Sequence, residues 1–378
     1  MRNNTSDYPL YIGLMSGTSL DGVDGVLVAS PPDGSASGLT LASAHIPFSA
    51  SARAELMALQ FPGENEIHRE AMAANMLVQH YAACVDELLA LTDQTPQSIR
   101  GIGVHGQTIR HRPESGYTRQ TNNPALLAEL TGIDVVADFR SRDIAAGGQG
   151  APLVPAFHQA LFASTTEARV VANIGGMSNI SVLGSDGRVI GFDTGPGNVL
   201  MDAWVALHHG KSYDTAGAWA AGGHEVDALL NTLRSEDFFA LPPPKSTGRD
   251  LFDAAWLAAK LAPFPMLQPC DVQATLAAFT ATTLADAIAD HGQNAKAVYV
   301  CGGGAYNTHL MQRLRQALVS RKQGAAVYTT EALGVSPNHV EALAFAWLAH
   351  RHVLRQPGNL PSVTGAKGLR ILGALYPA

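Results

Sequence analysis

The chain has 378 residues, of which 46% are hydrophobic and 15% are charged, and its formal net charge is −7 at pH 7. A chain of this length exceeds the size at which one hydrophobic core usually stops growing, so we expect two domains. The composition excludes a disordered chain, and the acidic balance excludes a global basic field for nucleic acid. An anion would have to be bound locally, by backbone N–H groups and a few placed side chains.

The cysteines and the N-terminus indicate a cytoplasmic protein. Cys84, Cys270 and Cys301 lie far apart in the sequence and match no metal-ligand spacing, so we expect reduced thiols. The segment Met1 to Pro9 is polar and does not resemble a signal peptide. No stretch reaches the roughly 18 apolar residues that a membrane span needs. We expect neither a membrane partner nor a nucleic-acid partner.

The first part of the chain alternates apolar runs with segments rich in helix-forming residues. The expected strands are Leu10 to Met15, Gly22 to Ala29, Ile102 to His105 and Ile133 to Phe139. The expected helices are Ser51 to Leu91, interrupted at Phe61 to Gly63, and Asn123 to Leu130. Pro124 suits the first position of the second helix.

The rest of the chain continues this alternation, which predicts α/β layering. The expected strands are Arg169 to Ile174, Ile180 to Leu183, Val189 to Phe192 and Ala297 to Cys301. The expected helices are Asn198 to His208, Asp271 to Asp290, Thr308 to Val319 and Val340 to Leu354. Asp186-Gly187 predicts a hairpin turn, Asn198 a helix cap, and Gln356 to Ala378 a tail that is mostly loop.

Glycine clusters follow several of these strands. They are Gly13 to Asp24, Gly175 to Asn179, Asp193 to Asn198 and Gly302 to Gly304. Nucleotide phosphates need several N–H donors on a backbone without an obstructing Cβ, and short glycine and hydroxyl turns provide them. One such cluster is usually only a turn, but four clusters after strands favour a nucleotide site. The first two clusters share the order strand, glycine turn, strand, which indicates two related halves.

Two familiar nucleotide motifs do not apply. Gly101 to Gly106 matches GxGxxG, but its glycines lie within a predicted strand and no helix follows, as a dinucleotide-binding turn requires. Gly210-Lys211-Ser212 resembles the end of a Walker A loop, but Val205 stands where that loop needs a glycine.

Several segments together resemble the anhydro-N-acetylmuramic acid kinase family. The longest is Ile12 to Asp24 (IGLMSGTSLDGVD). The others, in chain order, are Val104 to Thr108, Asp138 to Arg140 with Gly147 to Leu153, Asn173 to Asn179, Phe192 to Asn198 and Glu341 to Leu348. The matches span most of the chain and keep the family's order.

This resemblance implies an α/β, two-domain, actin-like ATPase fold of the hexokinase and Hsp70 type, with a cleft between the domains. The implied lobes are 1–132 plus 350–378, and 133–349. It also implies ATP with Mg²⁺, 1,6-anhydro-N-acetylmuramic acid as the substrate, N-acetylmuramic acid 6-phosphate as the product, a role in cell-wall recycling, and a homodimer.

The resemblance assigns catalysis to Asp193. The anhydro sugar has an internal bond between C1 and O6, so water must attack C1 while O6 takes the γ-phosphoryl group. That water needs a general base, and Asp193 ends a predicted strand before a glycine turn. The alternative role for Asp193 is a turn carboxylate that accepts N–H bonds from Gly195 or Gly197.

The expected sugar-binding residues are Ser16, His105, Arg140 and Glu341. Arg140, or else Arg142, suits the lactyl carboxylate, with a surface ion pair as the alternative. His105 could orient a hydroxyl or a water, or be a satisfied core histidine. Glu341 could contact the sugar, or favour the first turn of its helix through the macrodipole.

The expected nucleotide-binding residues form four groups in the glycine clusters. They are Gly17, Thr18, Ser19, Leu20, Asp21, Gly22, Val23 and Asp24, then Gly175 and Gly176, then Gly195 and Asn198, then Gly302 and Gly303. Asp21 is expected to act on Mg²⁺ directly or through its water shell, with turn stabilisation as the alternative. Gly302 and Gly303 are expected near adenosine, unless they only form a strand-to-helix turn.

Three other functions compete with this kinase. The first is another sugar or acetate kinase on the same fold. The second is a non-catalytic actin-like or chaperone ATPase. The third is a glycosidase that needs no ATP. Such an enzyme would ordinarily require two carboxylates flanking the scissile bond, and it would not need the four glycine clusters.

Overall fold

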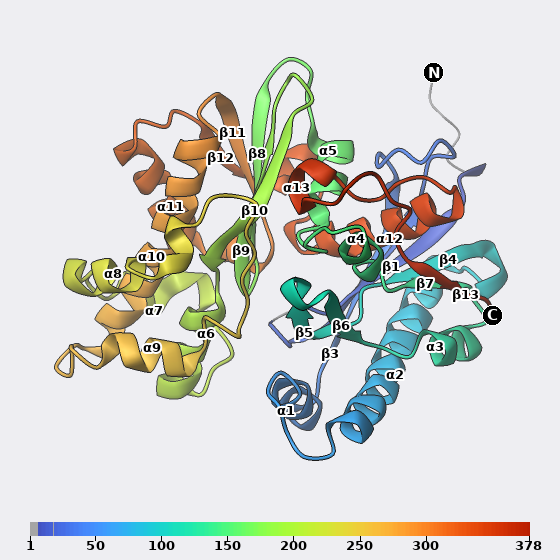
Figure 1. Cartoon of the computed structure of the whole chain (residues 1–378), viewed down its shortest axis with the longest axis horizontal. Helices are drawn as coiled ribbons and strands as arrows, with labels where there is room; N and C mark the ends of the chain where they lie inside the picture. Colours follow the sequence, from blue (N-terminus) through green and yellow to red (C-terminus); the bar gives the residue numbers. More distant parts are fainter. Residues whose placement is uncertain (1–6, 18) are drawn as a thin grey trace. The chain divides into compact units, whose positions relative to one another are not determined.

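The computed structural model describes residues 7–17 and 19–378, which divide into two compact units (Figure 1). Unit 1 contains the described residues up to Leu161 together with His339–Ala378, and unit 2 is Phe162–Asn338. This division differs from the expected lobes, because residues 133–161 and 339–349 belong to unit 1. The expected cleft stays a prediction.

A mixed sheet forms the core of unit 1. Among the described residues it has six strands, in the order β13 (Ala374–Tyr376), β7 (Val135–Ala137), β4 (Ile99–Val104), β1 (Leu10–Met15), β2 (Gly22–Ala29) and β3 (Leu39–Pro47). β1 pairs antiparallel with β2 and parallel with β4, and β4 pairs parallel with β7. The predicted strand at residues 133–139 is therefore part of this sheet, and this pairing explains why the first lobe extends past residue 132.

Helices cover the sheet of unit 1. They are α1 (Ala50–Ala58), α2 (Glu66–Thr92), α3 (Pro124–Thr131), α4 (Ser141–Ala145), α5 (Val154–Phe162), which begins in unit 1, α12 (Val340–Val353) and α13 (Pro361–Thr364). α1 and α2 are separated around Phe61–Gly63, as predicted. α2 packs against β2 and β3, and α12 packs against β1 and β4. A hairpin of β5 (Gln107–Arg112) and β6 (Tyr117–Thr121) completes the unit.

Two glycines allow α12 to lie directly on the sheet. A Cβ at Gly13 in β1 would overlap the Ala342 carbonyl oxygen, and a Cβ at Gly103 in β4 would overlap the Phe345 carbonyl oxygen. Gly103 belongs to the GxGxxG match, so the structure gives this glycine a packing role. β5 rather than a helix follows Gly106, which confirms that the dinucleotide motif does not apply.

Unit 2 repeats the sheet of unit 1. Its five strands among the described residues lie in the order β10 (Val189–Pro196), β9 (Met177–Leu183), β8 (Ala168–Ile174), β11 (Ala295–Cys301) and β12 (Ala326–Thr329). β8, β9 and β10 pair antiparallel in sequence, whereas β11 pairs parallel with β8 and β12. The same order and directions occur in β3, β2, β1, β4 and β7. This duplication confirms the two related halves and the α/β class, and agrees with the actin-like fold.

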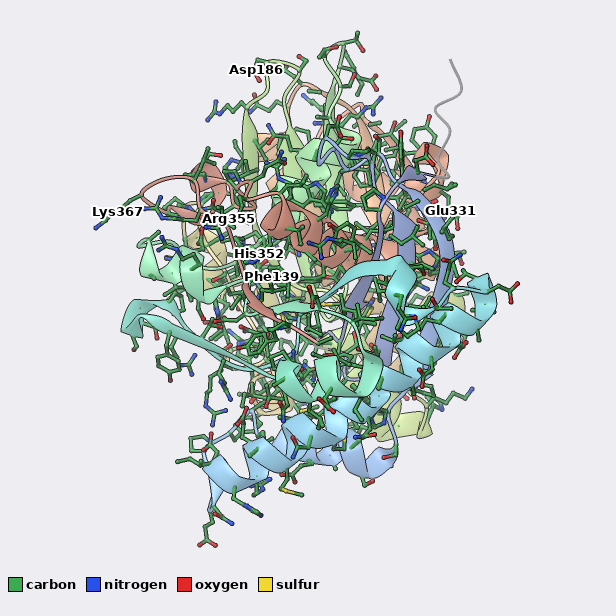
Figure 2. The ribbon with its side chains drawn as sticks, turned by 90° about the vertical axis from the view of Figure 1, so that its right-hand side faces the viewer. Phe139, Asp186, Glu331, His352, Arg355 and Lys367 are labelled. Carbon is green, nitrogen blue, oxygen red and sulfur yellow. The ribbon has the colours of Figure 1, made fainter. Side chains whose placement is uncertain are left out.

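The β9–β10 hairpin turns where the sequence predicted. Asp186 lies at its tip (Figure 2), where its Oδ1 accepts the Arg188 N–H at 2.9 Å. The Gly187 N–H donates to the Gly184 carbonyl at 3.0 Å, and Gly187 has a φ of 84°. A glycine adopts this left-handed conformation at no steric cost.

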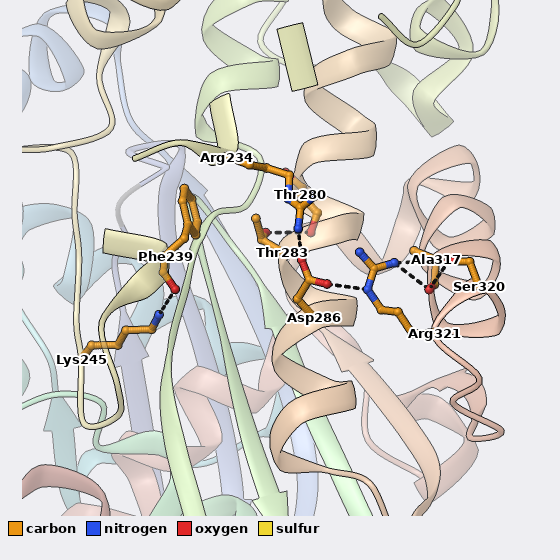
Figure 3. Close-up of polar contacts among 9 residues, drawn as sticks. All are labelled: Arg234, Phe239, Lys245, Thr280, Thr283, Asp286, Ala317, Ser320 and Arg321. Carbon is orange, nitrogen blue, oxygen red and sulfur yellow. Dashed lines mark hydrogen bonds and ion pairs between the residues drawn. The ribbon is translucent and has the colours of Figure 1, made fainter. Parts of the chain in front are cut away.

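The helices of unit 2 are α6 (Val199–His209), α7 (Ala218–Ala221), α8 (Asp227–Arg234), α9 (Ala254–Leu261), α10 (Pro269–His291) and α11 (Thr308–Ser320). α10 packs against β9, β10 and α11. Its Asp286 bonds Arg234 Nη2 at 2.8 Å and Arg321 Nε at 2.6 Å, which joins α8 and α11 to α10 (Figure 3). Gly210 ends α6 in the left-handed conformation, so it serves as a helix stop and not as a phosphate loop.

α10 corrects the expectation that no segment has the length and hydropathy of a membrane span. By length and composition alone it passes that test, as the one such helix among the described residues. However, 78% of its most apolar window is buried inside the protein. The core helix of a globular unit meets the same criterion, and Leu276, Phe279 and Leu284 of α10 lie in the core of unit 2.

Candidate active site

The β1–β2 turn contains the longest predicted nucleotide-binding segment, and half of it belongs to the core of unit 1. Leu20 and Val23 are fully buried in that core. Gly22, Val23 and Asp24 lie in β2, where they pair with residues of β3, and Asp24 also pairs with Met15 of β1. The side chains of Leu20 and Val23 are therefore committed to packing, and their predicted contacts with a nucleotide stay untested.

The accessible part of this turn is Gly17, Ser19 and Asp21. Thr18 lies outside the described residues. Desolvation by the surrounding chain, followed by the charge of Asp24, raises the pKa of Asp21. Asp21 is exposed, and its Oδ1 accepts the Gly22 N–H at 3.1 Å, which agrees with the turn-stabilising alternative. Asp24 is engaged elsewhere, because its Oδ1 bonds His45 Nδ1 at 2.8 Å and this bond raises the pKa of His45.

Ser16, at the end of β1, is buried and bonded. Its Oγ lies 2.8 Å from Tyr81 Oη and donates to the Gly106 carbonyl at 3.3 Å. The neighbouring Gln107 donates from Nε2 to the Gly17 carbonyl at 3.2 Å, while its buried Oε1 has no protein partner. Ser16 therefore helps to fix the turn, and its predicted contact with the sugar stays a prediction.

His105 and Arg140 meet in unit 1. His105 Nε2 accepts from Arg140 Nε at 3.0 Å and Nη2 at 2.9 Å, and Arg140 Nη1 donates to the Gly150 carbonyl at 2.8 Å. Burial and then the Arg140 charge hold the pKa of His105 well below its ordinary value. Because guanidinium nitrogens only donate, His105 is a neutral ring with its proton on Nδ1. Nδ1 is buried and makes no hydrogen bond of ordinary geometry, although hydrogen bonding to the backbone of Ser16 and Gly106 acts to raise the pKa of the ring.

The third expected sugar-binding position in unit 1 is Glu341, which lies in the first turn of α12 as predicted and is half-buried. Arg142, the alternative to Arg140, is exposed on α4. The structure therefore joins Arg140 to His105 and leaves Arg142 at the surface.

In unit 2, two glycine turns bond to each other through their backbones. The Gly175 carbonyl accepts the Asn198 N–H at 2.8 Å, and the Gly176 carbonyl accepts the N–H groups of Gly197 at 2.9 Å and Val199 at 3.1 Å. A Cβ at Gly197 would overlap the Gly175 carbonyl. The carbonyls of the first turn thus satisfy the first N–H groups of α6.

Asn198 precedes α6 as predicted, but it does not cap the helix with its side chain. Its Nδ2 instead donates to the Ile174 carbonyl at 3.2 Å. The expectation of a side-chain cap was therefore wrong, because the Asn198 amide bonds the end of β8 instead.

The third glycine turn of unit 2 adjoins the other two. Gly302 has a φ of 79°, and its N–H donates to the Pro337 carbonyl at 3.0 Å. A Cβ at Gly302 would lie 2.7 Å from the Ile174 carbonyl oxygen, and one at Gly303 would lie 3.7 Å from Asn198 Nδ2. The structure thus brings Gly175, Asn198 and Gly303 together, although they are far apart in the sequence.

Asp193 stands next to these turns on β10. It pairs with Asn179 of β9 immediately before a bulge that shifts the register at Gly195. Its Oδ2 accepts the Thr247 N–H at 2.9 Å, and its own N–H donates to the Lys245 carbonyl at 3.1 Å. The Asp193 carboxylate thus accepts from Thr247, and the Gly197 N–H bonds the Gly176 carbonyl. Bulges that re-aim side chains are common beside active sites.

Lys245 holds this segment in place. Its Nζ donates to the Phe239 carbonyl at 3.3 Å (Figure 3) and to the Phe238 carbonyl at 3.1 Å, and burial lowers its pKa. Phe239 in turn covers Gly195, where a Cβ would lie 2.8 Å from the ring. Neither Lys245 nor Thr247 was predicted, since the proline-rich sequence around them signals only a connection.

Unsatisfied buried polar atoms surround Asp193. Asn179 Oδ1, Ser178 Oγ and Thr247 Oγ1 have no protein hydrogen-bond partner, and all belong to residues paired with or bonded to the Asp193–Gly195 stretch. Buried polar atoms normally find partners, so each is a position where a water or a substrate hydroxyl fits. Polar atoms of this kind near Asp193 suit a carboxylate that takes a proton from water.

The residues present fit magnesium better than a metal held by the protein alone. No group of three or more His, Cys, Asp and Glu side chains suited to a metal occurs in residues 7–17 and 19–378. Mg²⁺ commonly keeps several waters and takes one or two carboxylates together with substrate phosphates. Asp21, an exposed residue, can supply one such carboxylate.

Comparison with known proteins identifies the relatives of this chain. A family model described as anhydro-N-acetylmuramic acid kinase matches residues 9–378. The anhydro-N-acetylmuramic acid kinase of Burkholderia orbicola (strain MC0-3) is 59% identical, covering 97% of this chain and 96% of the relative. That of Paraburkholderia xenovorans (strain LB400) is also 59% identical, over 97% of this chain and 98% of the relative.

A solved structure with a similar fold is component A of the Acidaminococcus fermentans (R)-2-hydroxyglutaryl-CoA dehydratase. Its TM-score is 0.49 at 12% identity, and the match covers 92% of this chain and 99% of that one. This level of similarity carries no functional argument.

Proposed function

Because this chain belongs to the anhydro-N-acetylmuramic acid kinase family, we propose that it uses ATP and water to convert 1,6-anhydro-N-acetylmuramic acid to N-acetylmuramic acid 6-phosphate and ADP. The oxygen of water bonds to C1 of the sugar as the C1–O6 bond breaks. O6 bonds to the γ-phosphorus of ATP as ADP leaves. The proton of the attacking water passes to a base, so atoms and charge balance.

Asp193 is the base in this proposal. The observation that carries this assignment is its position at the β10 bulge, beside three adjoining glycine turns and the unsatisfied oxygens of Asn179 and Thr247. A carboxylate held by the Thr247 N–H is oriented to take a proton from water. The turn at Gly175 and Gly176 would approach the phosphates with its backbone N–H groups, because those of Gly197, Asn198 and Gly302 already bond protein carbonyls.

His105 and Arg140 bind the sugar in this proposal. Arg140 brings positive charge for the lactyl carboxylate, and it keeps His105 neutral with a proton on Nδ1. Such a ring can donate a hydrogen bond to the sugar, but it does not accept a proton at Nε2 while Arg140 occupies that nitrogen. Glu341 and Ser16 complete the proposed sugar contacts.

Asp21 would hold Mg²⁺ directly or through water. The ion would neutralise charge on the transferred phosphoryl group. We further propose that the protein works in the cytoplasm, in recycling of the cell wall, and as a homodimer. These three statements follow from the family and the composition.

Turnover in oxygen-18 water tests the proposed reaction. Protein, Mg-ATP and 1,6-anhydro-N-acetylmuramic acid should yield ADP and a 6-phosphosugar with the label at C1, which mass spectrometry can locate. Label in free phosphate instead would indicate a plain ATPase and would contradict the proposal. Release of unphosphorylated sugar without ADP would indicate a glycosidase.

A further inference from the structure

We propose that Asp143 is a positioning residue for the Arg140–His105 pair and that the C-terminal segment 359–370 acts on the sugar site through it. The effect on the sugar rests on the proposed function, whereas the effect on the His105 ring does not. Asp143 was not among the predicted site residues.

Asp143 lies in α4 with no exposed surface, and several hydrogen-bond donors converge on its carboxylate. Oδ2 accepts the Gly150 N–H at 2.9 Å. Oδ1 accepts from Asn359 Nδ2 at 2.7 Å and from Thr364 Oγ1 at 2.8 Å. A buried carboxylate is costly unless donors surround it, and here each of these partners is a donor. Both oxygens of Asp143 therefore act as hydrogen-bond acceptors at this position.

Gly150 carries the effect from Asp143 to Arg140. Its N–H bonds Asp143, while its carbonyl accepts Arg140 Nη1 at 2.8 Å. Gly150 has a φ of 66°, and a Cβ there would lie 2.7 Å from Ile144 Cγ1. A Cβ at Gly148 would overlap Asp143 Oδ2. The loop packs closely against the Asp143 carboxylate. The position of this carboxylate therefore determines where the Gly150 carbonyl lies, and that carbonyl orients Arg140.

The C-terminal segment holds the other side of Asp143. The Gln149 N–H donates to the Thr364 carbonyl at 2.7 Å, and the Lys367 N–H donates to the Ala146 carbonyl at 2.9 Å. Asn359 is itself oriented, because its Oδ1 accepts the Arg370 N–H at 2.7 Å. The side chain of Lys367 projects outward (Figure 2), while its backbone is tied to the loop. The C-terminal segment therefore fixes the loop whose Gly150 carbonyl bonds Arg140.

A carboxamide cannot replace this carboxylate. Asp143→Asn would direct an NH₂ group at a donor on one side, either the Gly150 N–H or the Asn359 amide. The Asn359 amide cannot simply turn over, since its oxygen already accepts from Arg370. We expect the loop to shift, Arg140 to lose its alignment with His105, and the sugar to bind less tightly.

Exchanging the two side chains should restore the bonds at position 143, while the bond from Asn359 Nδ2 to the Gly368 carbonyl is lost. In Asp143→Asn with Asn359→Asp, the new amide oxygen accepts from Gly150, and its NH₂ donates to the new carboxylate at position 359. That carboxylate can still accept from Arg370. Asn359→Asp alone places two carboxylates in contact and should be worse than the double variant.

The experiment compares D143N, N359D, the double variant and the matched control D33N, an exposed aspartate of unit 1. We expect D143N to raise the KM for the anhydro sugar at least about tenfold while the KM for ATP stays within about twofold. The double variant should recover most of this loss, and D33N should behave as wild type. If D143N folds poorly, T364A removes one donor and should shift the sugar KM in the same direction by less.

Nitrogen-15 NMR of labelled histidine reports the His105 ring without any substrate. The signal is assigned among the 14 histidines by its loss in H105Q. Wild type should show the neutral Nδ1–H form, D143N should shift it, and the double variant should restore it. Unchanged His105 signals in a folded D143N would overturn the proposal. Shifted signals with an unchanged sugar KM would support the positioning role and refute the sugar site at His105.

Discussion

The two sheets share one strand order, but the turns at corresponding strand ends are held in different ways. After β1 in unit 1, side chains fix the turn, with Ser16 bonded to Tyr81 and Gln107 bonded to the Gly17 carbonyl. After β8 in unit 2, backbone bonds backbone, through the carbonyls of Gly175 and Gly176. The same strand arrangement thus supports one turn that is held mainly by side chains and another that is held by backbone carbonyls.

The units also differ in their buried histidines. Burial lowers the pKa of His158 to about 3 and that of His350 to about 4, and both belong to unit 1, as does His105. A histidine kept neutral in the folded state ties stability to pH. Unit 1 should therefore be sensitive to mild acid, whereas the backbone bonds of the unit 2 turns do not titrate.

The largest expected effect concerns the carboxylate of unit 2. Asp193→Asn should lower kcat by about 10²–10⁴-fold, because the amide cannot take the proton of water. The fold should persist, since the amide oxygen can still accept the Thr247 N–H. Steady-state kinetics measures the change, with Asp186→Asn at the hairpin tip as the control. A kcat within tenfold of wild type would exclude Asp193 as the base.

A second prediction tests the contact between sheet and helix in unit 1. Gly103→Ala would push a Cβ into the Phe345 carbonyl, so the free energy of unfolding should fall by about 2–4 kcal/mol. Urea unfolding followed by the fluorescence of Trp347 in α12 can measure this loss. Gly324→Ala is the control, because a Cβ at that position would meet no atom within 4 Å. Equal stability of the two variants would show that α12 can move away freely.

The third prediction concerns acid. His350 titrates near pH 6.5 when unfolded and at about 4 when folded, so the unfolded chain binds more protons between these values. The free energy of unfolding should fall as the pH drops through this window, by at most about 1.4 kcal/mol per pH unit from this residue. His350→Phe, which keeps a ring beside Tyr11, should flatten the profile. An unchanged slope in urea unfolding from pH 7 to 4 would contradict the prediction.

The smallest expected effect lies on the surface of unit 2. Asp286 is about one-third exposed and bonds both Arg234 and Arg321 (Figure 3). Asp286→Asn should lower the free energy of unfolding by about 1 kcal/mol or less, because solvent screens such pairs. The loss should shrink further in high salt. A loss that salt does not change would mean that the pair acts by packing.

Strong periodic signals predicted the main elements, and weak ones did not. α2, α10, β1 and β8 were found because long helical patterns and buried apolar runs are distinctive. β3 was missed because it is an edge strand, whose Leu39 and Leu41 are exposed. The tail was expected to be mostly loop. Its residues 359–370 bond Asp143 and the backbone of Ala146 and Gln149, and β13 pairs with β7.

The candidate site residues came from sequence motifs. Asp193, Arg140 and the glycine turns at Gly175 and Gly195 lie in the segments that resemble the family, whereas Gly302 to Gly304 lies outside them. Asp143 was missed because its partners Asn359 and Thr364 are 216 and 221 residues away in the sequence. A single aspartate in a polar stretch gives no sign of such pairing. The tautomer of His105 likewise depends on Arg140, a contact that only folding creates.

Unit 1 is assembled from both ends of the chain, and this has a consequence for biosynthesis. On the ribosome, the continuous segment of unit 2 is complete before α12, Asn359 and β13 have been made. Domains generally fold as their residues emerge, so unit 2 can fold first. Until α12 has been made, β1 and β4 lack the helix that covers them. Chaperones that bind exposed apolar strands would then meet the first half of this protein during translation, and a ribosome stalled before α12 would leave it unfinished.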